Sequence, residues 1–294
     1  MHKLVGMKEH SNSVPQNNFG IPASIIRTGK TLQFFSKSLV ANLVAKLFIT
    51  PIRHKTPERE EMMRESAKGE MVFIPSLGYE VMVYTYGYSK TKVLLAHGWS
   101  GRGTQMYAIA DKILENGMMI ISFDGPAHGL SEGKTTTPAE FIKTIAFLDS
   151  TYGPFEAAVG HSFGSISLLK SVSNGLKLNK LVVIGTEYTI TNILENLIEN
   201  LQLKASIINK LKKKLDRKFK GNIEIYAAAN SAKKVTIPTL ILHDTKDKNV
   251  DVSSAYKLRQ NLSKGELLVT SGLGHQSILR DENIISRIIE FIKR

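Results

Sequence analysis

The sequence predicts an α/β protein with a mostly parallel, eight-stranded sheet that carries helices on both faces. From about residue 70 onward, short β-rich runs alternate with helical segments, which is typical of strand–helix–strand units. Several predicted strands, such as 118–123 and 180–185, are continuous apolar runs, as expected when both faces of a sheet are buried. The length of 294 residues and the hydrophobic content of 42% are enough for a sizeable core.

The predicted strands are short and regularly spaced. They cover residues 71–75, 79–87, 92–97, 118–123, 155–160, 180–185, 237–243 and 266–270. Links of a few residues join the first strands and are too short for a crossover helix, so we expect the sheet to open with a hairpin. Helices are predicted between the later strands, over residues 103–116, 138–150, 163–174, 253–262 and 277–293.

Three segments fall outside this alternation. Residues 1–20 are polar and are expected to form a flexible leader, and residues 21–69 are expected to form an N-terminal helical extension. Residues 187–235 hold helical patterns but no strand, so they predict a helical lid inserted into a framework of residues 70–186 and 236–294. Insertions of this kind often cover an active site.

Residues 31–49 predict one amphipathic helix. Its apolar residues recur at helical spacing: Leu32, Phe35, Leu39, Leu43 and Leu47. Docking of this helix on the body of the protein and attachment to a membrane surface are both open. No run reaches about 18 uncharged apolar residues, so no membrane span is expected. The N-terminus lacks the apolar run of a signal peptide. We therefore expect a cytoplasmic location, and the alternative is a cytoplasmic protein in peripheral contact with a membrane.

Composition excludes some chemistry and restricts the partners. The chain has no cysteine, which excludes disulfides, thiolate metal sites and cysteine nucleophiles. The net charge of +13 is uneven, because residues 1–70 and 187–235 each carry +5 and the remaining framework carries +3. The basic run in the insertion is not interleaved with stacking aromatic residues, so we expect no nucleic-acid partner. Weak contact of the leader and lid with an anionic membrane surface stays open, beside the alternative of a solvated lysine-rich surface.

The most informative motif is Gly160-His161-Ser162-Phe163-Gly164, which has the form Gly-x-Ser-x-Gly. It lies between a predicted strand, 155–160, and a predicted helix, 163–174. On such a sharp turn the serine hydroxyl is exposed above the sheet, and the flanking glycines are needed because a Cβ there would clash with the strand and helix.

A serine nucleophile needs a base, and the base needs an acid that orients it. Downstream, strand 237–243 is followed by Asp244 and Asp247, and strand 266–270 is followed by His275. The chain order is therefore serine, acid, histidine, which is the order found on α/β sheets of this type. Each residue follows the C-terminal end of a strand, where open α/β sheets place their sites.

These motifs resemble those of the α/β-hydrolase superfamily over about residues 70–294. Besides the serine turn, the chain has His97-Gly98-Trp99 after one strand, Asp124-Gly125-Pro126-Ala127-His128-Gly129-Leu130-Ser131 after the next, and Gly274-His275. The resemblance implies an α/β-hydrolase fold, with Ser162 as nucleophile, His275 as base and Asp247 as acid. It also implies an oxyanion hole formed by the backbone N–H groups of Trp99 and Phe163, and no cofactor.

Each assignment has a competitor. Asp244 competes with Asp247, but in similar family loops the later aspartate is the acid, and Asp244 is expected to cap its own loop. His97, His161 and His243 are expected to be structural. His128 is a candidate substrate contact, although a structural role is the alternative. A metal site of His243, Asp244 and Asp247 is not expected, because the family resemblance already assigns that loop to the acid.

The resulting functional prediction is hydrolysis of a carboxylic ester or thioester through an acyl-enzyme. The lid residues Leu194, Leu197 and Ile198 are candidate substrate contacts and predict an apolar acyl pocket for a small-molecule acyl ester. The alternatives are an acyltransferase or a peptidase with the same three residues, and a non-catalytic or membrane-associated protein on a hydrolase scaffold. A dinucleotide site at residues 98–103 is excluded, because the Gly-x-Gly-x-x-Gly spacing is absent.

Overall fold

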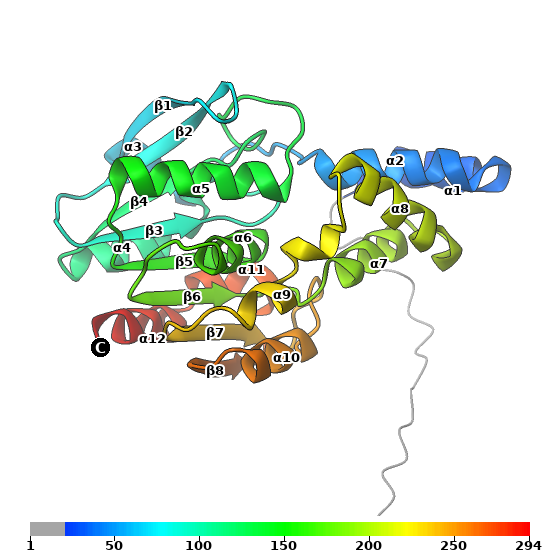
Figure 1. Cartoon of the computed structure of the whole chain (residues 1–294). Coiled ribbons are helices and arrows are strands. Elements are labelled where there is room, and N and C mark those ends of the chain that lie inside the picture. The colour runs from blue at the N-terminus through cyan, green and yellow to red at the C-terminus, as the bar shows by residue number, and fades with distance from the viewer. Residues whose placement is uncertain (1–20) are drawn as a thin grey trace, which may run out of the picture.

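The computed structural model describes residues 21–294, which form an eight-stranded sheet with helices on both faces (Figure 1). The strands are β1 (Lys68–Ile74), β2 (Tyr79–Tyr86), β3 (Lys92–Ala96), β4 (Met119–Phe123), β5 (Ala157–His161), β6 (Lys180–Ile184), β7 (Thr239–Asp244) and β8 (Gly265–Thr270). Their order across the sheet is β1-β2-β4-β3-β5-β6-β7-β8. The eight predicted strands are confirmed to within three residues at each end.

The sheet is antiparallel at one edge and parallel elsewhere. β1 and β2 pair as an antiparallel hairpin, and β2 also runs antiparallel to β4. All pairings from β4 to β8 are parallel. The C-terminal ends of the parallel strands therefore meet at one edge, and the loops that follow them lie next to one another.

Two helical layers cover the sheet. One face packs against α4 (Tyr107–Glu115) and α12 (Glu282–Lys293). The other face packs against α5 (Pro138–Tyr152), α6 (Phe163–Ser173), α9 (Ala228–Ala232) and α10 (Ser253–Asn261). In β3, Val93 and Leu95 enter the first layer while Leu94 and Ala96 enter the second. Burial on both faces explains why these strands are uninterrupted apolar runs.

A third hydrophobic core lies beside the C-terminal ends of the strands. It joins α1 (Ala23–Phe35) and α2 (Lys37–Ile49) to α7 (Ile190–Asn200) and α8 (Ile208–Lys218). We call these four helices the cap. Figure 1 shows the cap extending to one side of the sheet. Segments more than a hundred residues apart thus share one core. The shorter helices α3 (Glu61–Ser66) and α11 (Gly274–Ser277) lie outside the cap.

The N-terminal helices correct one prediction. A single helix was expected over residues 31–49, but the helix is interrupted at Ser36, whose backbone is extended and whose hydroxyl accepts hydrogen bonds from the N–H groups of Ser38 and Leu39. Such a cap starts a new helix. The interruption changes which face is buried, so Phe35 and Leu39 are exposed. The buried residues of α2 are Val40, Ala41, Val44, Ala45 and Ile49.

Within residues 21–294, no helix is both long and apolar enough to cross a membrane. The leader predicted at residues 1–20 lies outside the described residues.

Candidate active site

Ser162 occupies a strained turn between β5 and α6. Its φ of 50° and ψ of −112° lie in a region that residues with side chains rarely adopt. A Cβ on Gly160 would lie 2.7 Å from the backbone nitrogen of Ser165, in the following helix. A Cβ on Gly164 would lie 2.0 Å from the carbonyl oxygen of Ala96 in β3. Both glycines are therefore required for the tight contact between the turn, the helix and the neighbouring strand.

His275 lies in α11, after β8, and its ring contacts the loop after β7. The Nδ1 atom donates a hydrogen bond of 2.6 Å to Oδ2 of Asp247. The other carboxylate oxygen accepts from the N–H groups of Asn249 and Val250, at 2.8 and 2.9 Å. Burial raises the pKa of Asp247, but the hydrogen bonds from His275 and from these amides outweigh it and lower the pKa overall. Because a charged carboxylate only accepts, the proton lies on Nδ1 and Nε2 keeps a lone pair.

The serine turn and the histidine loop are joined directly. Nε2 of His161, the residue before Ser162, donates a 2.9 Å hydrogen bond to the carbonyl oxygen of His275. The two imidazole rings lie 4.6 Å apart. Gly185, after β6, adopts a φ of +58°, and a Cβ there would lie 3.1 Å from the ring of His275. Among residues 21–294, no hydrogen bond joins the Ser162 hydroxyl to the His275 ring.

The loop after β3 approaches the serine from the other side. A Cβ on Gly98 would lie 3.2 Å from the Cβ of Ser162. The next residue, Trp99, packs edge-on against Phe163, with ring centroids 5.3 Å apart. In the described part of the chain, the backbone N–H groups of Trp99 and Phe163 have no hydrogen-bond acceptor. Two unpaired amide donors therefore lie on the two segments that meet at Ser162.

His97 holds the β3 and β4 loops together. Nδ1 donates to the carbonyl oxygen of Gly98 at 2.7 Å, and Nε2 accepts from the N–H of Gly125 at 2.8 Å. Complete burial lowers the pKa of His97 well below its usual value, and the neighbouring His128 lowers it further. The ring is neutral and both nitrogens are used, which is the structural role expected from the sequence.

The competing aspartate, Asp244, ties two loops together. It accepts hydrogen bonds from the N–H groups of Lys246 and Leu273 and from the Thr270 hydroxyl, at 2.8 to 3.0 Å. Burial raises the pKa of Asp244, but these backbone and hydroxyl donors outweigh it and lower the pKa to about 2. The bond to Lys246, two residues on, is the loop cap expected from the sequence. Asp247, and not Asp244, contacts His275.

The predicted substrate contacts lie in different parts of the structure: His128 lies near the serine turn, whereas the three lid residues belong to the cap. His128 is buried, and its ring lies 5.3 Å from that of Trp99, at the oxyanion-side loop. Leu194 and Ile198, by contrast, lie inside the cap core, fully or almost fully buried. They pack in the same core as residues of α2, and their role as substrate contacts stays a prediction. Leu197 is partly buried at the border of that core.

Comparison with known proteins supports the fold. No protein-family model and no curated protein sequence matches the chain. Solved structures do. An esterase of Pyrococcus furiosus, Pf2001, aligns with a TM-score of 0.64 at 19% identity, over 84% of this chain and 97% of that one. An esterase of Exiguobacterium antarcticum aligns with a TM-score of 0.60 at 19% identity, over 77% of this chain and 100% of that one.

A third structure, Est1E of Butyrivibrio proteoclasticus with ferulic acid bound, aligns with a TM-score of 0.58 at 16% identity, over 76% of this chain and 100% of that one. The strand order, the serine turn and the likeness to these structures together identify the fold. The chain has the α/β-hydrolase fold. The likeness establishes the architecture, and the chemistry of the site has to be argued from the residues of this chain.

One part of the site was not predicted from the sequence: the connection that follows α2. We call residues 49–53 the strap. The N–H of Ile52 donates to the hydroxyl of Ser100, next to Trp99, at 2.9 Å. The guanidinium of Arg53 donates to the carbonyl oxygens of Ala127 and Gly133 at 3.1 and 3.0 Å. The strap thus connects the cap to both loops beside the serine.

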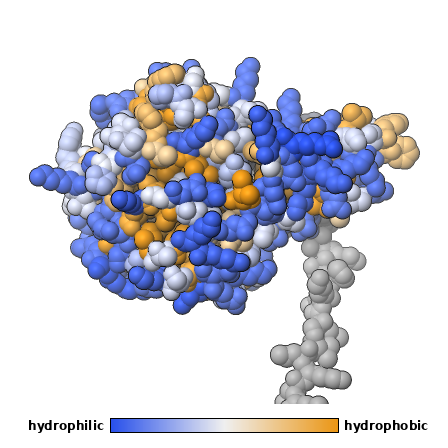
Figure 2. All heavy atoms as spheres, in the orientation of Figure 1, coloured by the Kyte–Doolittle hydropathy of each residue, from blue (hydrophilic) through white to orange (hydrophobic). Residues whose placement is uncertain are grey.

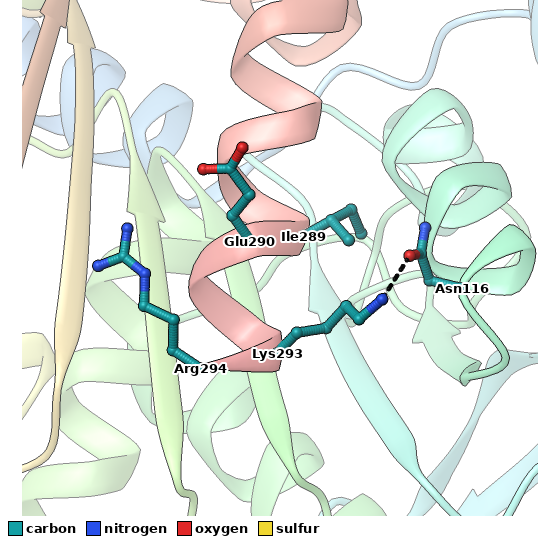
Figure 3. A pocket seen from close by; sticks show the side chains of 5 residues that line it. All are labelled: Asn116, Ile289, Glu290, Lys293 and Arg294. Atoms are coloured by element: carbon teal, nitrogen blue, oxygen red, sulfur yellow. Dashed lines mark hydrogen bonds between the residues drawn. The ribbon is translucent and has the colours of Figure 1, made fainter.

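Figure 3 shows a hollow of about 490 Å³ at the end of α12. Five side chains line it: Asn116, Ile289, Glu290, Lys293 and Arg294. Lys293 donates to Asn116 across it, at 3.1 Å. It lies near the N-terminal ends of the parallel strands, at the edge opposite Ser162 (Figure 1). Within residues 21–294, no group of three or more histidine, aspartate or glutamate side chains could hold a metal ion.

Proposed function

We propose that this chain is a serine hydrolase that cleaves carboxylic esters or thioesters, with Ser162 as nucleophile, His275 as base and Asp247 as acid. One observation carries the proposal: a histidine that donates to a charged, buried carboxylate at 2.6 Å lies beside a serine held at positive φ. The esterase names of the similar structures agree with this chemistry.

Acylation begins with Nε2 of His275, which takes the proton of the Ser162 hydroxyl as the oxygen attacks the substrate carbonyl carbon. The carbonyl π bond breaks and its oxygen becomes an oxyanion. The unpaired N–H groups of Trp99 and Phe163 are the donors for that oxyanion, and each such donor typically contributes about 2.7–4 kcal/mol to barrier lowering. Asp247 keeps the imidazole in the required tautomer and stabilises its charged form.

The tetrahedral intermediate then collapses. The bond to the leaving alkoxide or thiolate breaks, and His275 returns its proton to that group. Water follows the same route: His275 takes a proton from water, the hydroxide attacks the acyl-serine, and the acid product leaves as Ser162 regains its proton. Alkoxides and thiolates depend less on protonation than amines, so esters and thioesters are the favoured substrates.

The cap and the β4 loop form the substrate side. We propose that residues 187–235 act as a lid together with the extension 21–69, over a framework of 70–186 and 236–294. His128, neutral because burial lowers its pKa to about 4, offers Nε2 as an acceptor that has no partner among the described residues. Because this Nε2 atom is buried, a small-molecule acyl ester with a hydrogen-bond donor near its carbonyl would reach it only when the ring or the loop moves.

A fluorophosphonate probe tests the nucleophile. The wild-type chain should become labelled, and Ser162→Ala should abolish the labelling. Ser206→Ala, which replaces an exposed serine between α7 and α8, should not abolish it. A panel of p-nitrophenyl esters from acetate to palmitate then ranks acyl chains, with Ser162→Ala as the blank. A folded wild-type chain that neither labels nor hydrolyses any ester would contradict the proposal.

A further inference from the structure

The outer end of the cap exposes an unusual concentration of apolar side chains. At the turn between α1 and α2, Phe34 is 87% exposed, Phe35 is 75% exposed and Leu39 is 49% exposed. The rings of Phe34 and Phe35 pack edge to face against each other, 5.5 Å apart, and not against the body of the protein. Figures 1 and 2 show this turn at the end of the cap farthest from the sheet, with apolar atoms at its surface.

The same end of the molecule is strongly basic. Residues 21–49 and 200–215 contain nine lysine and arginine residues and no aspartate or glutamate. On α8 the two leucines Leu211 and Leu215 are buried, whereas five cationic residues are exposed: Lys210, Lys213, Lys214, Arg217 and Lys218. Lys210 donates to the Ser38 hydroxyl at 3.2 Å, so these cationic residues begin beside the exposed phenylalanines.

We propose that this end of the cap docks on an anionic lipid bilayer, with Phe34 and Phe35 entering the interface and the lysines of α8 contacting the headgroups. Apolar insertion and cationic attraction are the two forces that bind amphipathic helices to membranes. Charge favours this occupant, because cationic residues outnumber carboxylates: residues 21–49 hold four lysine and arginine residues and no carboxylate, and residues 199–218 hold seven with Glu199 and Asp216. This excess of positive charge is complementary to a negative bilayer and would repel a second copy of the chain meeting it face to face.

The geometry also allows docking without unfolding of the cap. The apolar residues that hold the cap together, such as Val44 and Leu194, are buried in its core and take no part in the exposed tip. The tip is the turn between α1 and α2, so Phe34 and Phe35 can enter a membrane interface without breaking the hydrogen bonds of either helix. Membrane binding at this tip does not require Ser162, so it can be measured in a chain without hydrolytic activity.

Vesicle co-sedimentation of the full chain tests the proposal. We expect binding to vesicles of mixed phosphatidylcholine and phosphatidylglycerol and little binding to phosphatidylcholine alone. High salt should weaken the binding, because exposed charges are screened. Phe34→Ser/Phe35→Ser and Lys210→Gln/Lys213→Gln/Lys214→Gln should each lower the partition coefficient about tenfold or more.

Matched controls keep the test specific. Tyr88→Ser removes an exposed aromatic ring from the β2–β3 connection, at the opposite edge of the sheet. Lys90→Gln/Lys177→Gln/Lys264→Gln removes the same number of exposed lysines ahead of β3, β6 and β8. Neither control should change vesicle binding. Ser162→Ala should bind vesicles as the wild type does, so loss of hydrolysis and loss of binding are separable.

A fluorescent label gives an independent readout. Because the chain has no cysteine, Phe35→Cys provides one labelling site for a polarity-sensitive dye, and Tyr88→Cys provides the control. Anionic vesicles should shift the emission of the dye at residue 35 to the blue and leave that at residue 88 unchanged. Equal emission shifts at residues 35 and 88 would overturn the proposal. So would equal binding of the wild-type chain to vesicles with and without phosphatidylglycerol. So would a Phe34→Ser/Phe35→Ser variant that only changes a dimer to a monomer in sedimentation velocity, since the occupant would then be a second copy.

Discussion

The imidazole of His161 donates a hydrogen bond of 2.9 Å to the backbone carbonyl of His275, and the two rings lie 4.6 Å apart. The residue before the proposed nucleophile thereby positions the loop that carries the proposed base. Burial, together with the neighbouring His275, lowers the pKa of His161 to about 3, so it stays neutral and keeps the proton on the donating nitrogen.

Replacing His161 tests this positioning role. We expect His161→Phe to lower kcat about tenfold with little change in KM, because the His275 loop loses its tether while the substrate-binding surface remains. His161→Gln, which keeps an amide donor, should retain more of kcat. Ester hydrolysis kinetics measure both. Equal kcat in the wild type and His161→Phe would refute the role.

The two aspartates after β7 should separate chemistry from stability. Asp247→Asn should lower kcat about 10⁴-fold, because the carboxylate no longer holds the His275 tautomer. Asp244→Asn should chiefly destabilise, because Asp244 ties the β7 loop to the β8 loop. The lowered pKa of Asp244 contributes stability above its ordinary value of 3.8, which is lost as pH falls toward 2.

Kinetics and thermal unfolding of both variants check this division. The reverse pattern, with activity lost in Asp244→Asn and retained in Asp247→Asn, would exchange their roles.

Buried neutral histidines should make the fold sensitive to mild acid. Burial lowers the pKa of His161 to about 3 and that of His128 to about 4, so below pH 6.5 the unfolded chain binds protons that the folded chain does not. The free energy of unfolding should fall with decreasing pH, by up to about 1.4 kcal/mol per pH unit for each such group. Urea unfolding between pH 7.5 and about 4.5 measures the slope. His128→Asn should flatten it, while His54→Asn, at an exposed position, should not.

Substitution of a glycine in the serine turn should destabilise the fold far more than substitution of a glycine that has open space around it. Gly164→Ala should destabilise by about 3 kcal/mol or prevent folding, because the new Cβ would lie 2.0 Å from the Ala96 carbonyl oxygen. Gly221→Ala, where nothing lies within 4 Å of the Cβ, is the matched control and should change stability by about 0.5 kcal/mol or less. Chemical denaturation compares the two.

Arg53 should be a positioning residue for the loop that carries His128. Arg53→Ala removes the hydrogen bonds to the carbonyl oxygens of Ala127 and Gly133, and we expect kcat/KM to fall about tenfold with a small change in melting temperature. Arg59→Ala, at an exposed position in the same extension, should leave both unchanged. Unchanged kcat/KM in Arg53→Ala would show that the strap does not influence the site.

The sequence alone determined the sheet, the serine turn and the order in which the site residues follow their strands. Local apolar runs identify the strands, and the Gly-x-Ser-x-Gly pattern identifies the turn. Gly160 is required by contacts within its own strand–turn–helix unit, whereas Gly164 is required by the close approach of the neighbouring strand β3. Because parallel strands end at one edge, residues placed after them must converge, wherever they lie in the chain.

Tertiary structure decided what depends on contacts between distant segments. Asp244 and Asp247 are three residues apart, and only the path of the β8 loop places Asp247 against His275. The cap core buries Leu194 and Ile198 together with residues of α2, and the sequence pattern could not show that this partner lies more than a hundred residues earlier in the chain. Arg53 has no motif around it, and its role follows from three-dimensional proximity to the β4 loop. Local sequence patterns indicate whether a segment forms a helix, a strand or a turn. Which other segment it packs against depends on the packing of the whole chain.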